Sequence, residues 1–393
     1  MQKKALIIFA CTWLIAFSSS CTKTPRSEQI LDSADFSFVR SVPLSYATQF
    51  TADEYELRPH SADSGAKQTV TLLTIATGEH FLLASADTPL PEQIPESVTV
   101  LRTPVTNIYL AASSAMSLFS ALDSLDHIRF SALKASDWYI PAAKEALENG
   151  SIVYAGKYSA PDFELLVKSG CPLAIESMMI THTPHIKEKL EALGIPVFID
   201  RASYEAEPLG RLEWILCYAL LLGKSREAEA FFHAQCEKVR AVQDSVAHLN
   251  AQNKKRVAFF YVTANGMIVV RGAHDYIVRM IEQAGGEYAF SENLSVKQES
   301  PSVTISMEQF YALASDADCL IYNSSIDSTV HSIDDLCAKN ALFAEFSAVK
   351  HRCVWRTTQS VYQASDRIGD LILDIHRIIT DSDEAVQFLE HVQ

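Results

Sequence analysis

Residues 225–250 read SREAEAFFHAQCEKVRAVQDSVAHLN, and this stretch decides the fold. Its apolar residues recur at every third or fourth position: Phe232, Cys236, Val239, Val242, Val246 and Leu249. This spacing gives a helix one apolar stripe, with charged residues on its other faces. The stretch has no Gly or Pro, and Ser225 is a suitable N-cap with Glu227 and Glu229 in the first turn. We therefore predict a single helix roughly 39 Å long, at ~1.5 Å per residue.

The predicted helix separates two long regions, residues 38–224 and 251–393, in which strands and helices alternate. One interpretation is a rigid strut that holds two α/β lobes at a fixed spacing. The other is an ordinary long helix inside one domain. The helix pattern alone is compatible with both interpretations.

The first twenty residues read as an export signal. Lys3 and Lys4 precede an apolar run, 5–17, that is too short to span a bilayer. Small residues then lead to Cys21, an arrangement that resembles a bacterial lipoprotein signal, although Ser18 stands where Leu is usual. We predict a signal at 1–20, lipid on Cys21 and a polar tether over 21–37. Plain secretion and an uncleaved anchor are the alternatives.

Composition supports a large folded core and limits the partners. Of 393 residues, 48% are hydrophobic and 9% aromatic, and no further apolar run is long enough to cross a membrane. The net charge of −15 argues against nucleic acid and anionic lipid surfaces as partners. Beyond Cys11 and Cys21, the cysteines are scattered without a C-x-x-C, so we expect structural thiols rather than disulfides or zinc ligands: Cys171, Cys217, Cys236, Cys319, Cys337 and Cys353.

The first region begins with two strands, 70–76 and 79–84, joined by Thr77-Gly78, and 98–105 is a candidate third strand. From residue 106 to 199 buried strands and short helices alternate, which predicts a mostly parallel sheet covered on both faces. Ligands of such sheets bind beyond the carboxyl ends of the strands. That rule singles out Ser113, Ser114, Lys157, Tyr158, Glu176 and Ser177.

The second region predicts a smaller α/β lobe. A strong strand, 257–263, is followed by the hairpin-type turn Asn265-Gly266 and a second strand. Helix 276–284, a buried strand at 319–322 and a short strand at 353–355 follow. Residues 366–379 close the chain as a helix with one apolar face.

Taken in order, these segments resemble the substrate-binding proteins of bacterial iron-siderophore, haem and vitamin B12 ABC importers, over roughly 105–379. In that family one long helix joins two α/β lobes, so the resemblance favours the strut. No single segment is specific, but their order and spacing together are. The matching segments are 109–125, SAPDFELL at 159–166, KEKLEALGIPVF at 187–198, LLGK at 221–224 with Ala228 and Ala230, 272–287, and FSAVK at 346–350 with Val354.

The resemblance implies a lipid-anchored binding protein in the periplasm or at the cell surface. Such a protein captures a ferric siderophore, haem or cobalamin between its lobes and delivers it to an ABC permease with its ATPase. It would act as a monomer, without a cofactor or catalytic residue. The resemblance also assigns Glu164 and Glu287 to permease docking, one carboxylate per lobe, each able to accept a bidentate contact from arginine. The alternative for each is a solvated glutamate at a helix end.

Candidate ligand contacts lie at predicted strand ends in both lobes. Aromatic side chains suit a flat or bulky ligand, and Lys157 and Arg271 could neutralise an anionic chelate. Packing or surface roles remain open for each residue. The set is Ser113, Ser114, Trp138, Tyr139, Lys157, Tyr158 and Met178 from the first lobe, and Arg271, Tyr276, Asn323, Ser324, Gln359 and Tyr362 from the second.

Enzymes and bare-metal sites find less support. The sequence lacks G-x-S-x-G, H-E-x-x-H, G-x-x-x-x-G-K and G-x-G-x-x-G. His182 and His185 are separated by Pro184, and no third ligand is evident, so surface histidines are the simpler interpretation. Arg211 and Glu213 are expected to brace the lobe junction. The rival functions are an enzyme or scavenging lipoprotein with this fold, and a free-metal receptor.

Overall fold

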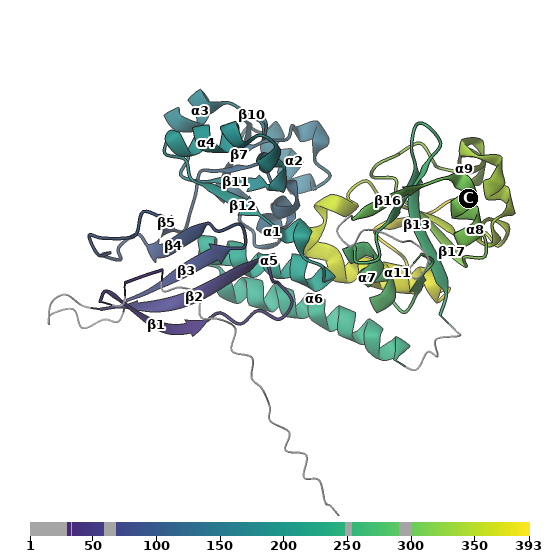
Figure 1. The fold of residues 1–393 in the computed structure, drawn as a ribbon, viewed down its shortest axis with the longest axis horizontal. Coiled ribbons are helices and arrows are strands. Elements are labelled where there is room, and N and C mark those ends of the chain that lie inside the picture. The colour runs from purple at the N-terminus through teal and green to yellow at the C-terminus, as the bar shows by residue number, and fades with distance from the viewer. Residues whose placement is uncertain (1–29, 33, 59–67, 248–253, 291–300) are drawn as a thin grey trace, which may run out of the picture.

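The computed structural model describes residues 30–32, 34–58, 68–247, 254–290 and 301–393. The predicted signal, Cys21 and the predicted helix end at 248–250 lie outside the described residues. The described chain forms two α/β lobes, each with its own sheet, and the long helix α6 extends beneath both (Figure 1). This arrangement confirms the predicted fold class. No helix in the described parts is both long and apolar enough to cross a membrane.

The first lobe is built on a parallel sheet in the order β12-β11-β6-β7-β8. Helices connect its strands and cover both faces, as the alternating pattern predicted. Its elements are β6 (Ile108–Leu110), α1 (Met116–Ala121), β7 (Ile128–Ser131), α2 (Pro141–Glu148), β8 (Val153–Tyr154), the small hairpin β9 (Gly156–Lys157) and β10 (Ala160–Pro161), α3 (Phe163–Lys168), β11 (Ala174–Ser177), α4 (Pro184–Ala192) and β12 (Val197–Asp200).

A separate five-stranded sheet precedes this lobe, in the order β1-β2-β3-β4-β5. Its strands are β1 (Phe36–Ser41), β2 (Phe50–Leu57), β3 (Thr69–Ile75), β4 (His80–Ser85) and β5 (Val98–Thr103). One face packs against the first lobe, where the Phe50 and Trp214 rings lie 5.1 Å apart. The other face forms a smaller core with Leu31, which is 1% exposed. The sequence predicted β3, β4 and β5 but missed β1 and β2.

The second lobe has a mixed sheet in the order β16-β14-β13-β17-β18-β19, with β15 also pairing with β13. Strands β13, β17 and β18 are parallel, and the antiparallel β13–β14 pair confirms the predicted hairpin. Its elements are β13 (Arg256–Val262), β14 (Ile268–Arg271), α7 (Tyr276–Gln283), β15 (Glu287–Tyr288), β16 (Ser302–Ile305), α8 (Met307–Ala314), β17 (Cys319–Tyr322), α9 (Ile333–Lys339), α10 (Ser347–Lys350), β18 (Val354–Thr357), α11 (Ile368–Ile379) and β19 (Leu389–His391).

The long helix α6 (Ser225–Val246) follows α5 (Pro208–Leu222) after a tight turn at Gly223. Its predicted apolar stripe packs toward the protein, with Phe232, Val239 and Val242 buried. These residues belong to one apolar core that also contains residues of α5, α7, α11 and both lobes. The helix α6 is therefore not an isolated connection between the lobes, because α5, α7 and α11 pack against its apolar stripe.

The N-cap of the helix was predicted wrongly. The N-cap is Lys224, and Ser225 is already helical, because α5 ends only two residues earlier and Gly223 makes the turn with φ 70°. The buried stripe also includes Gln235, whose backbone and side chain lie so close to Gly369 on α11 that a Cβ there would approach Gln235 Oε1 to 2.6 Å. Glycine thus permits the close approach of α6 and α11.

Candidate ligand site between the lobes

The loops that follow the carboxyl ends of strands in both lobes meet at the lobe junction. In the first lobe, residues 113–115 follow β6 and residues 132–140 follow β7. In the second, residues 358–367 follow β18. The Tyr139 backbone N–H donates to Gln363 Oε1 at 2.8 Å, and Gln363 Nε2 donates to the Asp137 carbonyl at 2.8 Å. The carboxyl ends of the two sheets therefore face the same junction, as expected for a ligand site in this architecture.

Tyr139 and Gln359, both on the predicted contact list, also meet across this junction. The Tyr139 hydroxyl donates to Gln359 Oε1. Both residues are exposed, so this contact lies at the surface of the junction. The loop 358–367 thus reaches from the second lobe to the first, and its side chains hold the loop that carries Trp138 and Tyr139.

Three predicted residues of the second lobe form one hydrogen-bonded cluster. The Tyr362 hydroxyl accepts from Arg271 Nη2 and, at 2.8 Å, from Asn323 Nδ2. Asn323 is fully buried, and its Oδ1 has no hydrogen-bond partner within the described residues. The neighbouring Ser324 Oγ is likewise buried without a partner there. Buried acceptors without partners are uncommon, so these atoms are candidates for contact with a ligand or an ordered water.

Arg271 brings a positive charge to this cluster. Its guanidinium lies 5.5 Å from the Phe259 ring centroid and 3.9 Å from Asp275 Oδ2, a distance too long for a good hydrogen bond. Burial raises the pKa of Asp275, and the charge of Arg271 partly opposes that rise. Burial also raises the pKa of Tyr362, so its hydroxyl stays neutral at physiological pH. The cluster can therefore offer cationic and hydroxyl donors to an anionic group.

The remaining second-lobe candidate, Tyr276, is 8% exposed and stacks on Arg211 of α5, with the guanidinium carbon 3.4 Å from the ring centroid. Arg211 also donates to the Ser203 carbonyl at 2.5 Å. The stack of Arg211 on Tyr276 joins α5 to α7 and agrees with the bracing role expected for Arg211. Tyr276 is consequently better placed to support the junction than to face an open site.

The first-lobe candidates are less closely connected. Ser113 and Ser114 are half-buried in the turn before α1, and Trp138 is 3% exposed with its Nε1 donating to Ser131 Oγ at 3.2 Å. Met178 Sδ accepts from Arg201 at 3.4 Å. Lys157 and Tyr158 lie in the β9–β10 hairpin, where Lys157 is exposed. Within the described residues, Lys157, Tyr158 and Met178 make no hydrogen bond or ring contact with the second-lobe cluster.

Glu176 lies at the carboxyl end of β11 and was noticed in the sequence but not included among the ligand contacts. It is 0% exposed, and neither carboxylate oxygen has a partner within the described residues. The nearby Tyr109 hydroxyl donates instead to the Gly156 carbonyl at 3.0 Å. Burial raises the pKa of Glu176 to about 8, so the side chain is mostly protonated at neutral pH. Strand position alone could not reveal this burial.

The two predicted docking carboxylates occupy different edges of their sheets. Glu164 is exposed in the first turn of α3, at the carboxyl edge of the first-lobe sheet. Glu287 is exposed on β15, opposite Arg256 at the start of β13, and hence at the amino edge of its sheet. Glu308 lies in the first turn of α8, which precedes β17 as α3 precedes β11. The topological equivalent of Glu164 in the second lobe is therefore Glu308, which the sequence interpretation missed.

Glu205, just before α5, and Glu213, on α5, secure the added sheet. The Glu213 carboxylate accepts backbone N–H groups of Ser45, Tyr46 and Ala47 at 2.6–2.7 Å. Glu205 accepts from the backbone of Thr48 and Gln49 and from Trp214 Nε1 at 3.0 Å. Both carboxylates are nearly inaccessible. They therefore bind the β1–β2 loop. Glu213 has a structural role as expected, but it holds the added sheet rather than the lobe junction.

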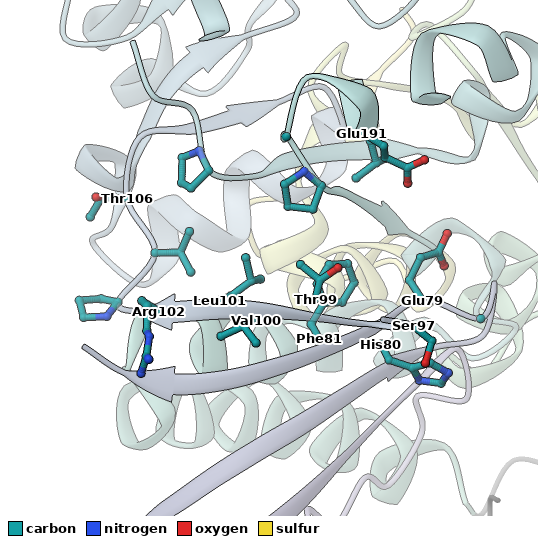
Figure 2. A pocket seen from close by; sticks show the side chains of 17 residues that line it. Glu79, His80, Phe81, Ser97, Thr99, Val100, Leu101, Arg102, Thr106 and Glu191 are labelled. Carbon is teal, nitrogen blue, oxygen red and sulfur yellow. The ribbon is translucent and has the colours of Figure 1, made fainter. Parts of the chain in front are cut away.

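A large groove lies away from this junction, between β5 and the amino edge of the first-lobe sheet (Figure 2). Its volume is about 870 Å³. The residues that line it immediately before the parallel strands include Thr106 before β6, Pro172 before β11 and Pro196 before β12. None of the predicted ligand contacts lines it, so it is a separate feature.

Metal-ligating side chains do not gather in the described parts of the chain. No group of three or more His, Cys, Asp or Glu there could hold an ion. His182 and His185 are both exposed, near the start of α4. The six described cysteines are free thiols, of which Cys171, Cys217 and Cys319 are buried.

Comparisons with known proteins agree with this geometry. The profile of a family described as "Periplasmic binding protein" matches residues 130–361. Two uncharacterized lipoproteins of Methanocaldococcus jannaschii are each 25% identical to the chain, over 80% and 86% of it and 76% and 85% of their own lengths. A periplasmic heme-binding protein from Pseudomonas aeruginosa has a TM-score of 0.58 at 17% identity, covering 73% of this chain and 98% of its own. A periplasmic binding protein from Veillonella parvula has a TM-score of 0.57 at 16% identity, covering 83% and 97%.

Proposed function

We propose that this chain, which belongs to the periplasmic binding protein family, captures a metal-chelate ligand between its lobes and delivers it to an ABC permease. The candidate ligands are a ferric siderophore, haem or cobalamin. The solved structure of similar fold from Pseudomonas aeruginosa is described as a periplasmic heme-binding protein, which supports the ligand class without identifying the ligand. Capture and delivery need no covalent chemistry and no resident cofactor.

One observation carries the proposal. Arg271, Asn323 and Tyr362 form a polar cluster behind the loop that joins the lobes, and the buried Asn323 Oδ1 has no partner within the described residues. The Arg271 guanidinium and the Tyr362 hydroxyl can donate to an anionic oxygen, which chelates such as ferric siderophores and haem present on their periphery, whereas Asn323 Oδ1 can only accept from a ligand N–H or O–H or from an ordered water. The aromatic rings of Tyr139 and Tyr362 would lie against the flat or bulky part of the ligand. The other predicted contacts remain part of this proposal, except Tyr276, which supports the junction.

Docking on the permease would use exposed carboxylates at matching edges of the two lobes. Glu164 supplies the first. For the second lobe, Glu287 is the sequence-based candidate and Glu308 is the candidate that topology favours. A two-fold permease presents equivalent arginines to both lobes, so equivalent positions on the lobes are the better geometric match.

A lipid on Cys21 would keep the protein at the membrane, beside its permease. The two archaeal relatives are named lipoproteins, which supports this part of the proposal. Cys21→Ala should move the protein from the membrane fraction to the soluble fraction. A variant that stays with the membrane would contradict lipid anchoring, and Cys11→Ala is the matched control.

The ligand test is a titration of the chain from Thr22 onward with haem, cobalamin and ferric siderophores, followed by tryptophan fluorescence. Trp138 is buried beside Tyr139 at the junction, whereas Trp214 lies in the first-lobe core. We expect saturable micromolar or tighter binding of one chelate, with a response that Trp138→Phe largely removes. Absence of binding by every chelate would contradict the proposal.

The rival functions give different outcomes in this titration or in an uptake assay. An enzyme would convert the bound chelate, and turnover would be seen as a progressive spectral change at constant protein concentration. A free-metal receptor would bind bare Fe³⁺, Zn²⁺ or Mn²⁺ without the chelator. A scavenging lipoprotein would bind the chelate but would not stimulate uptake through a permease and ATPase.

A further inference from the structure

The groove of Figure 2 follows a sheet edge rather than a sheet face. β5 pairs only with β4 among the described strands, so its other side is an edge. The consecutive residues Thr99–Arg102 all line the groove, whereas a face would present only alternate residues. Figure 2 shows this strand along one wall of the groove, with proline rings on the opposite wall. The backbone edge of β5 is therefore directed toward the groove.

This edge lacks the protection found at the other edge of the same sheet. β1 is interrupted by an irregularity between Phe38 and Arg40, and Arg40 pairs with Glu54 at 2.6 Å. Bulges and charged side chains are common ways to prevent unwanted strand pairing. β5, with the sequence VTVLRT, has neither Pro nor Lys and pairs regularly along all six residues. Its only charged residue, Arg102, also lines the groove, and its Nη1 donates to the carbonyls of Ser85 and Thr88 at 2.9 and 2.7 Å.

One end of the groove carries excess negative charge. Glu79 and Glu191 lie at the end where β5 begins (Figure 2). Lys187 Nζ is 2.6 Å from Glu191 Oε1 but 3.9 Å from Glu79 Oε1. The other Glu79 oxygen is buried and has no hydrogen-bond partner within the described residues. One ammonium between two carboxylates leaves an acceptor that a further Lys or Arg would satisfy.

The groove is separate from the proposed ligand site. Its opposite wall includes Gly194 and the prolines that precede β11 and β12, at the amino edge of the first-lobe sheet. The ligand candidates lie at the carboxyl edge. The strand β5 also precedes residues 130–361, the part of the chain that matches the family profile. The groove therefore combines the added sheet with the family fold.

We propose that the groove binds an extended segment of a partner protein, which adds as a further strand to β5 and places a Lys or Arg beside Glu79. Six residues of strand offer about 20 Å of backbone at ~3.3 Å per residue, and the volume of about 870 Å³ accommodates a peptide rather than a small ion. Backbone hydrogen bonds to β5 supply the affinity, and the two carboxylates select the basic residue. This binding does not depend on the metal chelate.

The test uses the chain from residue 22 to 393 and phage-displayed random peptides of about eight residues, a length typical of strands. We expect enriched peptides to alternate β-branched residues with polar ones and to carry one Lys or Arg. N-methylation of single peptide nitrogens should weaken binding about tenfold at the nitrogens that pair with β5 and little at the alternate ones. Glu79→Gln should weaken the basic peptides severalfold, whereas Glu148→Gln, at an exposed position in α2, should not.

Variants of β5 separate strand addition from other modes of binding. Val100→Pro interrupts the strand edge and should abolish peptide binding, whereas Val100→Ala keeps the backbone and should retain it. Thermal melting and chelate titration of both variants show whether the fold is preserved. If Val100→Pro is misfolded, the alternating N-methyl pattern still decides the question. Binding insensitive to N-methylation, the absence of enriched peptides, or self-association of the chain through β5 would each overturn the proposal.

Discussion

The two lobes contribute to the junction in different ways. In the second lobe Arg271, Asn323 and Tyr362 are linked by hydrogen bonds. In the first lobe the candidates are distributed over separate loops, and Tyr139 reaches the second lobe mainly through Gln359 and Gln363. A preformed cluster binds at a lower entropic cost than loops that must be ordered. If the proposed function holds, we expect the second lobe to determine affinity and the first lobe to close over the ligand.

The most severe effect is expected on chelate uptake, to which each lobe should contribute one docking carboxylate. Glu164→Ala combined with Glu308→Ala should reduce chelate uptake to background, because each lobe would lose its exposed docking carboxylate. Chelate affinity should remain unchanged, since both residues lie on outer helix turns. Uptake is measured in cells that depend on this importer.

The matched control is Glu164→Ala combined with Glu287→Ala. Full loss of uptake in this pair, with near-normal uptake in the Glu308 pair, would establish Glu287 as the second docking residue. Loss of chelate affinity in either pair would show that the docking face has been misassigned.

The second prediction contrasts a buried carboxyl of the first lobe with a half-buried carboxyl of the second. The pKa of Glu176 is raised from 4.5 to about 8, and that of Asp366 from 3.8 to about 6, in both cases chiefly by burial. Between its unfolded and folded pKa values each group binds a proton in the folded state but not in the unfolded state. The free energy of unfolding therefore falls as pH rises, from about pH 4 to 6 for Asp366 and from about pH 4.5 to 8 for Glu176.

Glu176→Gln should remove the fall above pH 6 and make the variant more stable than wild type at pH 8 or higher, by up to a few kcal/mol. Asp366→Asn should act only in the lower window. Urea unfolding across this pH range measures both effects, with exposed Glu164→Gln as the control. A stability difference between Glu176→Gln and wild type that does not change with pH would show that the carboxyl is already ionised in the folded protein.

The third prediction concerns the added sheet, which has no counterpart in the second lobe. Glu213→Ala would leave three partly buried backbone N–H groups without their acceptor, at a cost of about 1–3 kcal/mol. Urea unfolding should report this loss, and Glu213→Gln should recover part of it because the amide oxygen still accepts. Wild-type stability in Glu213→Ala would mean that water replaces the carboxylate and that the β1–β2 loop is not held by α5.

The smallest effect is expected on chelate affinity, which compares one cationic residue from each lobe. Arg271→Ala should weaken chelate binding about 10- to 100-fold, as expected for a hydrogen bond to a charged group. Lys157→Ala, an exposed lysine in the other lobe, should weaken binding no more than a few fold. Calorimetric titration measures both, with thermal melts as a check on folding. Equal losses would contradict the idea that the second lobe dominates affinity.

The sequence predicted features that depend on repeated local patterns. The stripe in α6, the strand–helix alternation and the hairpin at Asn265-Gly266 follow from residue spacing, and each is present in the structure. β2, with the sequence FTADEYEL, was missed because its outward residues are charged and its apolar residues are few. Its position depends on pairing with β1 and β3, which are distant contacts that a local pattern does not contain.

The candidate site was predicted less completely for the same reason. Strand ends identified Arg271, Asn323 and Tyr362, but not the bonds that join them. The lack of a hydrogen-bond partner for Glu176 within the described residues and the burial of Tyr276 against Arg211 depend on packing between elements far apart in sequence. The N-cap of α6 also failed as a prediction, because it depended on where α5 ended.

The most direct measurement is a crystal structure of the chain with the chelate that binds tightest in the titration. The account predicts that the chelate lies between the carboxyl ends of β11 and β17, with an anionic oxygen within hydrogen-bond distance of Arg271 and an aromatic face against Tyr139 or Tyr362. A chelate bound in the groove beside β5, or on the outside of either lobe, would contradict capture between the lobes.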